Sequence, residues 1–290
     1  MSLYAFQDES RLQDGKVYAA DLEKNGTPWE KNADYYCPSP NCTACMRYRK
    51  GSERQSAHFY ALGKQHSESC SYNHLEPYNP SDYAEAQFDF QHAMEVLQGE
   101  ARSQEDAQPG QNNSCTQKTS QPIKPLTKLK EIHRMLKNHD CREQIGKDHR
   151  TVGDMLLDNR NISGFRAEHL NCRYKIVEAM VSDPPVHQAR PRLSDSLKEF
   201  VNTLSLQEKV AYLPVLHLHL KSDQKELLLD VYFEDLSLFW EIIPRIWGGK
   251  GRRKPKNQFV VVAARWYQST EKAECYETVI KSKKQIIYFQ

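Results

Sequence analysis

Hydrophobic and polar residues alternate along several stretches of the C-terminal part of the chain. In 216–220 a leucine stands at every second position, and 227–233 repeats the alternation with leucine, valine and phenylalanine. A period of two is typical of strands with one buried face. The alternation predicts five strands, which are Arg173–Val181, Tyr212–Leu220, Glu226–Phe233, Gln258–Tyr267 and Glu274–Lys281.

A helix is expected between the third and fourth of these strands. In the segment 235–247, Asp235 is placed to cap a helix that Pro244 should kink or end. Five strands with a helix between the third and fourth match the order of an OB-type barrel. A twisted antiparallel sheet packed on two or three helices fits the same pattern, so both arrangements stay open.

Helical spacing appears earlier in the chain. Apolar residues recur at intervals of three and four in 125–138, which predicts an amphipathic helix, and a shorter helix is expected at 151–157. Residues 80–98 also have the pattern of a helix, with Ser81 as its N-cap. The first 75 residues are expected to form short β elements, including a strand at 15–20.

Composition divides the chain into three parts. The segment 98–122 contains no aromatic and no β-branched aliphatic residue, and it is rich in glutamine, serine, asparagine and proline. Such a segment cannot bury enough apolar area to offset the entropy lost on ordering, so we expect a flexible linker. The predicted organisation is a small N-terminal module with a trailing helix at 1–97, the linker at 98–122, and an α+β domain at 123–290.

Composition also limits the cellular compartment and the binding partners that we expect for this protein. Of the 290 residues, 39% are hydrophobic, and the mean hydropathy is -0.78. No apolar run approaches the roughly 18 residues that span a bilayer, and the first residues lack the features of a signal peptide. We therefore expect a cytoplasmic protein without a membrane partner, in which clustered thiols hold metal rather than form disulfides. The net charge of +2 restricts nucleic-acid binding to local patches.

Four of the eight cysteines and two histidines lie between positions 37 and 70. Thiolate and imidazole are the ligands that tetrahedral Zn²⁺ prefers, and small zinc folds close with two ligands on a tight turn and two more further along the chain. The predicted ligands are Cys37, Cys42, His58 and Cys70, with Cys45 and His66 as alternatives. No carboxylate beside the cluster is placed to act as a base, so we expect a structural zinc.

Several short motifs accompany this cluster, namely Gly15-Lys16-Val17, Tyr36-Cys37-Pro38, Arg49-Lys50-Gly51, His58-Phe59 and Cys70. Over about residues 5–75 they resemble the zinc-ribbon-like domain of the CoiA-like competence proteins and of related bacterial mobile-element proteins. Members of that family usually carry Cys-Pro-x-Cys, whereas two extra residues separate Cys37 from Cys42 here. Counting back from Gly51 places Cys42 in the second ligand position. The resemblance implies a ribbon module in a DNA-transfer, phage or mobile-element setting.

In that family the ribbon precedes a restriction-endonuclease-like domain with an aspartate and a Glu-x-Gln or Glu-x-Lys signature. No such signature follows Asp230 at the usual distance, so the resemblance does not imply that this chain is a nuclease. The sequence also lacks a P-loop, GxGxxG, GxSxG and HExxH, and we assign no catalytic residue. One alternative is an unrecognised nuclease in which Glu168, Glu178 or Asp230 binds Mg²⁺.

A run of basic residues near the C-terminal strands is suited to binding nucleic acid. Its charged residues are Lys250, Arg252, Arg253, Lys254 and Lys256. Lysine and arginine in a glycine-containing loop suit contacts with phosphates, which provide affinity without reading the base sequence. Tyr232, Trp266 and Tyr267 offer faces on which bases can stack, as OB folds do for single strands, although core packing is favoured for Trp266.

Together these features predict a non-catalytic nucleic-acid-binding protein with structural Zn²⁺, with single-stranded DNA as the first candidate partner. A second alternative is a protein-interaction module that docks a partner through the ribbon and the helix at 125–138. His217 and His219 share one face of a strand, but the sequence identifies no third ligand beside them, so it predicts no metal site there.

Overall fold

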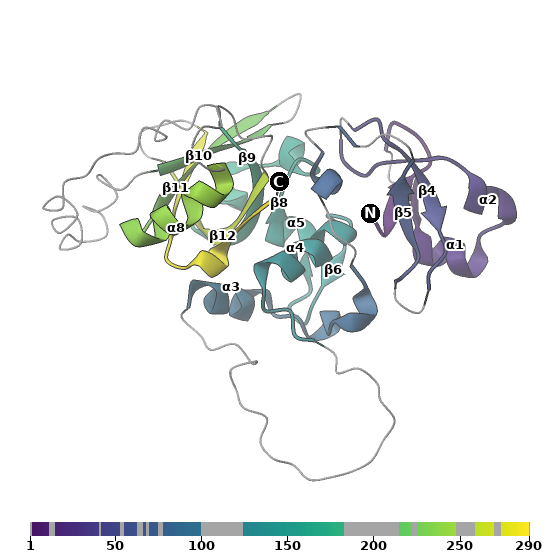
Figure 1. The fold of residues 1–290 in the computed structure, drawn as a ribbon, viewed down its shortest axis with the longest axis horizontal. Coiled ribbons are helices and arrows are strands. Elements are labelled where there is room, and N and C mark those ends of the chain that lie inside the picture. The colour runs from purple at the N-terminus through teal and green to yellow at the C-terminus, as the bar shows by residue number, and fades with distance from the viewer. Residues whose placement is uncertain are drawn as a thin grey trace, which may run out of the picture.

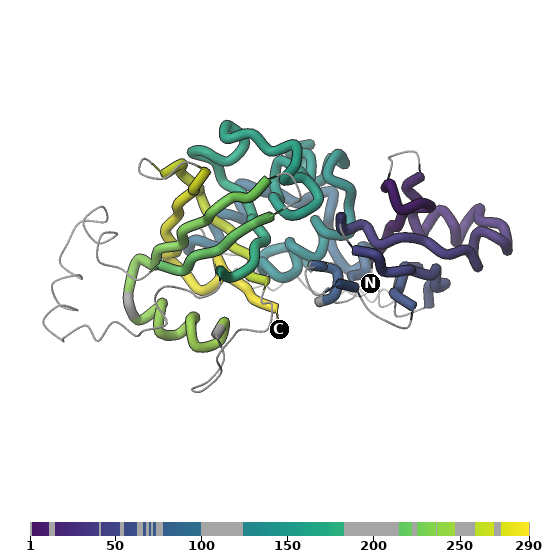
Figure 2. The backbone as a smooth tube through the Cα atoms, turned by 90° about the horizontal axis from the view of Figure 1, so that it is seen from above, coloured from purple at the N-terminus to yellow at the C-terminus, as the bar shows by residue number. Residues whose placement is uncertain are grey.

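The structure is a computed structural model that describes most of the chain. The described residues are 2–11, 15–40, 42–52, 55–62, 66–67, 70–74, 78–99, 124–182, 215–221, 225–247, 259–269 and 274–289. A small sheet lies at one end of the molecule and a β-barrel at the other, with short helices between them (Figures 1 and 2). This mixture of helices and strands is the α+β class that the sequence predicts.

The N-terminal sheet, which we call the ribbon, is antiparallel throughout and has the strand order β2-β1-β3-β4-β5. Its strands are β1 Tyr4–Phe6, β2 Lys16–Tyr18, β3 Tyr35–Tyr36, β4 Cys45–Arg49 and β5 His58–Ala61. Two short helices, α1 Ala19–Asn25 and α2 Pro28–Asn32, follow β2. The ribbon has a small core of its own, to which three buried cysteines contribute.

Five C-terminal strands close into a barrel. They are β9 Arg173–Val181, β10 Val215–Lys221, β11 Glu226–Phe233, β12 Phe259–Gln268 and β13 Cys275–Ile280. Around the ring β9 pairs with β10, β10 with β11, β11 with β13, β13 with β12, and β12 again with β9. The helix α8, Leu236–Trp247, joins the third strand to the fourth and continues through Pro244. This is the OB-like arrangement, and the prediction from strand alternation is confirmed.

Alternating side chains fill the barrel. Every second residue of β10 and β11 points inward, which produces the leucine rows seen in the sequence, and α8 packs on the same core. Trp266 on β12 is fully buried in this interior, and its indole Nε1–H donates to the carbonyl of Lys175 at 3.2 Å. The preference for core packing of Trp266 is confirmed, so its ring is not a surface for stacking.

A helical layer covers the outside of β9 and β12. It contains α3 Phe90–Gln98, α4 Leu129–Asn138, α5 Val152–Met155, the hairpin of β6 Gln144–Ile145 with β7 Arg150–Thr151, and the edge strands β8 Leu156–Leu157 and β14 Ile286–Phe289. Apolar residues of α3 and α4 pack with outward-facing Ile176, Val261 and Ala263 in a second core. The amphipathic helix expected at 125–138 is therefore present and packs on the barrel.

The region before α4 differs from the helix that the sequence predicts at 80–98. The helix expected at 80–98 begins only at Phe90, because Asp89 rather than Ser81 caps it by accepting from the amide of His92, while the preceding residues form 3₁₀ turns. This helix shares its core with the barrel side of the molecule, although the sequence grouped it with the ribbon. Gln98 and Gly99 end the helix, and the rest of the predicted linker lies outside the described residues.

Candidate metal centre

Three thiols and one imidazole converge at the edge of the ribbon. The side chains of Cys37, Cys42, His66 and Cys70 place one ligand atom each within 4.8 Å of all the others. Cys37 follows β3, and Cys42 precedes β4, so the turn between these strands supplies two donors. Cys70 precedes the 3₁₀ turn η2, Ser71–His74. The group has the chemistry of a Cys₃His metal site.

The distances within this group fit a tetrahedral ion. The sulfur atoms of Cys37 and Cys70 are 3.7 Å apart, and His66 Nδ1 lies 3.5 Å from the sulfur atoms of both Cys42 and Cys70. Metal bonds of the lengths that Zn²⁺ makes to sulfur and nitrogen would place tetrahedral ligands about 3.8 Å apart for two sulfurs and about 3.5 Å apart for sulfur and nitrogen. The four donors therefore already stand at the spacing of a closed metal site.

Burial makes metal binding at these thiols dependent on pH. Burial raises the pKa of Cys37 well above its ordinary value and raises the pKa of Cys70 to about 11, whereas hydrogen bonds from these two thiols lower the pKa of Cys42. Without a metal, most of the buried sulfurs would thus keep their protons at neutral pH. A divalent cation displaces such protons on binding, so metal affinity should increase with pH.

Backbone and arginine contacts hold the turn that carries Cys37 and Cys42. The amide of Ser39 donates to the sulfur of Cys37 at 3.4 Å, and the amide of Cys42 donates to the carbonyl of Ser39 at 3.3 Å. Arg11 donates to the carbonyls of both Cys37 and Cys42. These bonds fix the orientation of two donors before any metal binds, which is the role of outer contacts in metal sites.

The fourth donor differs from the predicted set. The structure brings His66 to the three thiols, the alternative named from the sequence, and does not bring His58. His58 lies on β5 and is buried there, with its Nδ1–H donating to the carbonyl of Ser56 at 2.9 Å. Cys45, the alternative to Cys42, lies on β4 beside Asp34 and is not part of the group.

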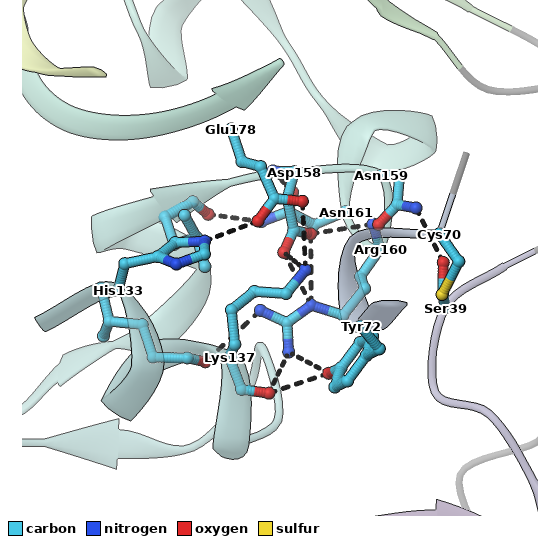
Figure 3. A network of polar contacts seen from close by, with 12 residues as sticks. Ser39, Cys70, Tyr72, His133, Lys137, Asp158, Asn159, Arg160, Asn161 and Glu178 are labelled. Atoms are coloured by element: carbon cyan, nitrogen blue, oxygen red, sulfur yellow. Dashed lines mark hydrogen bonds and ion pairs between the residues drawn. The ribbon is translucent and has the colours of Figure 1, made fainter. Parts of the chain in front are cut away.

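A polar network joins the turn of the metal centre to the helical layer (Figure 3). Asn159 donates from Nδ2 to the hydroxyl of Ser39 at 2.8 Å, and Ser39 in turn contacts Cys37. Two tyrosines of the ribbon meet the same layer, since Tyr4 and Tyr72 both accept hydrogen bonds from Arg160. The metal centre is therefore anchored to the rest of the molecule through its own turn.

Buried charges form the middle of this network. Arg160 pairs with Asp158 at 2.9 Å, and Lys137 pairs with the same carboxylate at 2.7 Å and with Glu178 at 3.4 Å. His133 Nε2–H donates to Glu178 at 2.5 Å. Burial alone would raise the pKa of Asp158, but the charges of Arg160 and Lys137 hold it below its ordinary value. The sequence does not reveal this network, because its members are spread from α4 to β9.

The acids proposed for a nuclease do not share one site. Glu178 lies in the buried network just described, while Glu168 is exposed and pairs with Arg166 and His169. Asp230 lies on β11, where it accepts a hydrogen bond from His217. Within the described part of the chain, no group of potential metal ligands contains more than one of these three acids.

On the outer side of β9 and β12 an arginine lies between two tyrosines, of which Tyr174 is partly buried against the second core. Arg265 on β12 places its guanidinium carbon 5.9 Å from the ring centre of Tyr174 and 5.8 Å from that of Tyr267. Tyr267 is 45% exposed, so one ring of this group is open to solvent. The predicted phosphate contacts Lys250, Arg252, Arg253, Lys254 and Lys256 lie outside the described residues, in the connection from α8 to β12.

Compared with protein-family models, with curated proteins and with solved structures, the chain shows no significant match in any of the three. Among the described residues, no helix is long and apolar enough to cross a lipid bilayer.

Proposed function

We propose that the chain is a non-catalytic nucleic-acid-binding protein whose OB-like barrel holds single-stranded DNA and whose ribbon is held together by a structural Zn²⁺. The observation that carries the proposal is the closed five-stranded barrel with α8 between its third and fourth strands. Barrels of this type bind oligonucleotides on their outer strands and connecting loops. The resemblance to CoiA-like proteins supports a setting in DNA transfer, a phage or a mobile element.

Zn²⁺ is the ion that the donor set of the ribbon fits best. Three sulfurs and one imidazole nitrogen at tetrahedral spacing are typical of structural zinc, and the four protein donors leave no position for a substrate. The ribbon core is small, and several of its buried residues are the ligands themselves. Metal binding should therefore supply much of the free energy that folds this part of the chain.

The barrel surface supports single-strand binding through the Tyr174, Arg265 and Tyr267 group. Aromatic rings and guanidinium planes stack on unpaired bases without selecting a sequence. The basic run at 250–256 would add phosphate contacts from the connection that enters β12. Stacking and phosphate contacts together are the two components of sequence-tolerant single-strand binding.

Fluorescence anisotropy with labelled single- and double-stranded DNA across a salt series tests this proposal. We expect single strands to bind more tightly, with an affinity that falls steeply as salt increases. Replacing the five basic residues by serine should reduce the slope of log affinity against log salt, because fewer counterions are released. Arg265→Ala combined with Tyr267→Ala should weaken binding at every salt concentration.

Arg47→Ala serves as the matched control, because Arg47 is an exposed arginine on β4 of the ribbon, paired with Asp34. Its affinity for DNA should equal that of the wild type. Flat anisotropy for both DNAs would overturn the proposal and favour the protein-interaction module. Cleavage of DNA that requires a divalent metal would contradict the non-catalytic part and favour a nuclease.

A further inference from the structure

Three neighbouring strands of the barrel place chemically reactive side chains in one row on the outer face. His217 on β10 lies directly opposite Asp230 on β11, and Asp230 lies directly opposite Glu277 on β13. Cys275 is two residues before Glu277 on β13 and therefore points to the same side of the sheet. This row is separate from the ribbon and from the Cys₃His group.

The donor atoms in this row are close enough to share one ion. One carboxylate oxygen each of Asp230 and Glu277 and the sulfur of Cys275 all lie within 4.8 Å of one another. Asp230 and Cys275 are buried and Glu277 is half-buried, so the group is not a set of solvated surface acids. Carboxylates directly opposite each other on paired strands repel, and a cation between them would turn this repulsion into attraction.

His217 holds the carboxylate of Asp230 in place. Its Nδ1–H donates to Asp230 at 2.5 Å, which orients the carboxylate from outside the three-donor group. Carboxylates that ligate metals are hydrogen-bonded by outer residues, and His217 would have this role beside Asp230.

We propose that Asp230, Cys275 and Glu277 form a second metal site on the barrel, with His217 as the residue that positions Asp230. The thiolate disfavours Mg²⁺ and Ca²⁺, which take oxygen ligands, whereas Zn²⁺ accepts sulfur and carboxylate together. Three protein donors leave the fourth corner of a tetrahedron for water or a ligand oxygen. The site thus differs from the ribbon centre, where four protein donors close the coordination shell.

Metal content per chain tests the proposal directly. The full chain is saturated with Zn²⁺, passed through a desalting column, and analysed by inductively coupled plasma mass spectrometry. We expect two zinc ions per wild-type chain. The double variant Asp230→Asn with Glu277→Gln should hold one, and Cys37→Ser with Cys42→Ser should also hold one, because each pair removes a different site.

Glu226→Gln is the matched control, since Glu226 is an acid on the same strand and the same face as Asp230 but lies outside the group. This variant should keep two zinc ions. The half-buried Glu277→Gln alone should lower the occupancy of the second site if the double variant fails to fold, as checked by circular dichroism. One zinc ion in the wild type, or two in a folded Asp230→Asn, Glu277→Gln double variant, would overturn the proposal.

The result is independent of nucleic-acid binding, because zinc content is measured without DNA. If the anisotropy experiment shows no DNA binding, the proposal of a second metal site is unaffected. If the wild type holds only one zinc ion, the proposal of DNA binding by the barrel is unaffected. Replacing zinc by Co²⁺ adds a spectroscopic check in a chain whose ribbon cysteines are intact. Cys275→Ser should reduce the sulfur-to-cobalt charge-transfer absorption, and unchanged absorption would contradict a Cys275 ligand.

Discussion

Cys42 and Cys45 are three residues apart, yet their side chains have different surroundings. The sulfur of Cys42 faces His66 and the other thiols, while Cys45 lies on β4 beside Asp34. Cys42→Ser should therefore release the ribbon zinc, whereas Cys45→Ser should retain it. Zinc content after dialysis, measured for both variants side by side, checks this prediction.

The two histidines allow a parallel comparison. His66→Ala should lose the ribbon metal, because its Nδ1 is the only nitrogen donor of the Cys₃His group. His58→Ala should keep the metal and lose some stability through the cavity left on β5. Metal loss in His58→Ala together with retention in His66→Ala would contradict the assignment and restore the ligand set predicted from sequence.

Lys175 is a charged residue that is buried in the folded protein. It is buried on β9, its ammonium donates to the carbonyl of Gly153 at 2.8 Å, and burial lowers its pKa to about 8. At pH 7 the folded protein must keep a buried charge, which costs stability. Lys175→Met should therefore stabilise the fold at pH 7 by about 1–2 kcal/mol, after allowing for the lost hydrogen bond.

The gain from Lys175→Met should depend on pH in a defined direction. Between pH 8 and about 10.4, the ordinary lysine pKa, the unfolded chain binds a proton at this lysine that the folded chain does not, so wild-type stability rises with pH. The advantage of the variant is thus complete below pH 8 and shrinks toward pH 10. Urea unfolding at pH 7 and pH 9.5 measures it, and an equal gain at both values would refute the interpretation.

At the level of elements, the segment 158–161 between β8 and η6 (Ile162–Gly164) connects the ribbon to the helical layer. Arg160 in this segment also donates to the carbonyls of Leu136 and His139 at the end of α4. Arg160→Met would remove these bonds and leave Asp158 with Lys137 as its remaining basic partner in the network. We expect a loss of about 3–5 kcal/mol of unfolding free energy, since two buried carboxylates, Asp158 and Glu178, would then share the single ammonium of Lys137.

Arg166→Met is the control for this prediction. Arg166 is an exposed arginine in the next turn, paired only loosely with Glu168 at 3.8 Å. Its replacement should change the free energy of unfolding by no more than about 0.5 kcal/mol. Urea denaturation of both variants provides the comparison, and similar losses for the two would show that the network contributes little.

Sequence patterns identified the strands of the barrel, because inward-facing residues such as Leu216 and Leu229 repeat with a period of two. They also identified α4, whose buried face includes Ile132 and Leu136. Closure of the barrel depends on which strands pair, and local periodicity does not contain that information. The start of α3 was missed because Ser81 and Asp89 are both good caps and only tertiary packing selects between them.

For the candidate sites too, local residue patterns could be predicted from the sequence, and contacts between distant parts of the chain could not. Clustering of thiols in the sequence identified a candidate metal centre and three of the four residues grouped there. The choice between His58 and His66 depends on the path of the chain after β5, which spacing does not determine. The row of Asp230 and Glu277 was invisible in the sequence, because the two strands that carry these residues are brought together by parallel pairing across α8 and β12.

For the whole molecule, the ribbon and the barrel should respond differently to a chelator. The ribbon core is small and includes three of the four candidate metal ligands, whereas the barrel core is larger and contains none of them. Removing zinc should therefore unfold the ribbon and leave the barrel folded. Hydrogen exchange with and without EDTA should show lost protection in β3 to β5 and retained protection in β9 and β12.

Cys45→Ser protein treated in the same way is the control, since it should behave as the wild type does. Simultaneous loss of protection in both regions would show instead that the two parts unfold as one cooperative unit. In that case the network around Arg160 would be the element that couples them.

The pairing of β9 with β12 also governs how the chain can fold as it leaves the ribosome. Met180 pairs with Phe259, and β12 pairs in turn with the late strand β14. These contacts join distant parts of the chain, so the barrel cannot close until nearly all of it has emerged, and such non-local pairing is slow. The ribbon leaves the ribosome before the barrel, and its metal group is complete once Cys70 has emerged. We therefore expect a nascent chain that captures zinc early and stays open at the barrel until β12, β13 and β14 have left the ribosome.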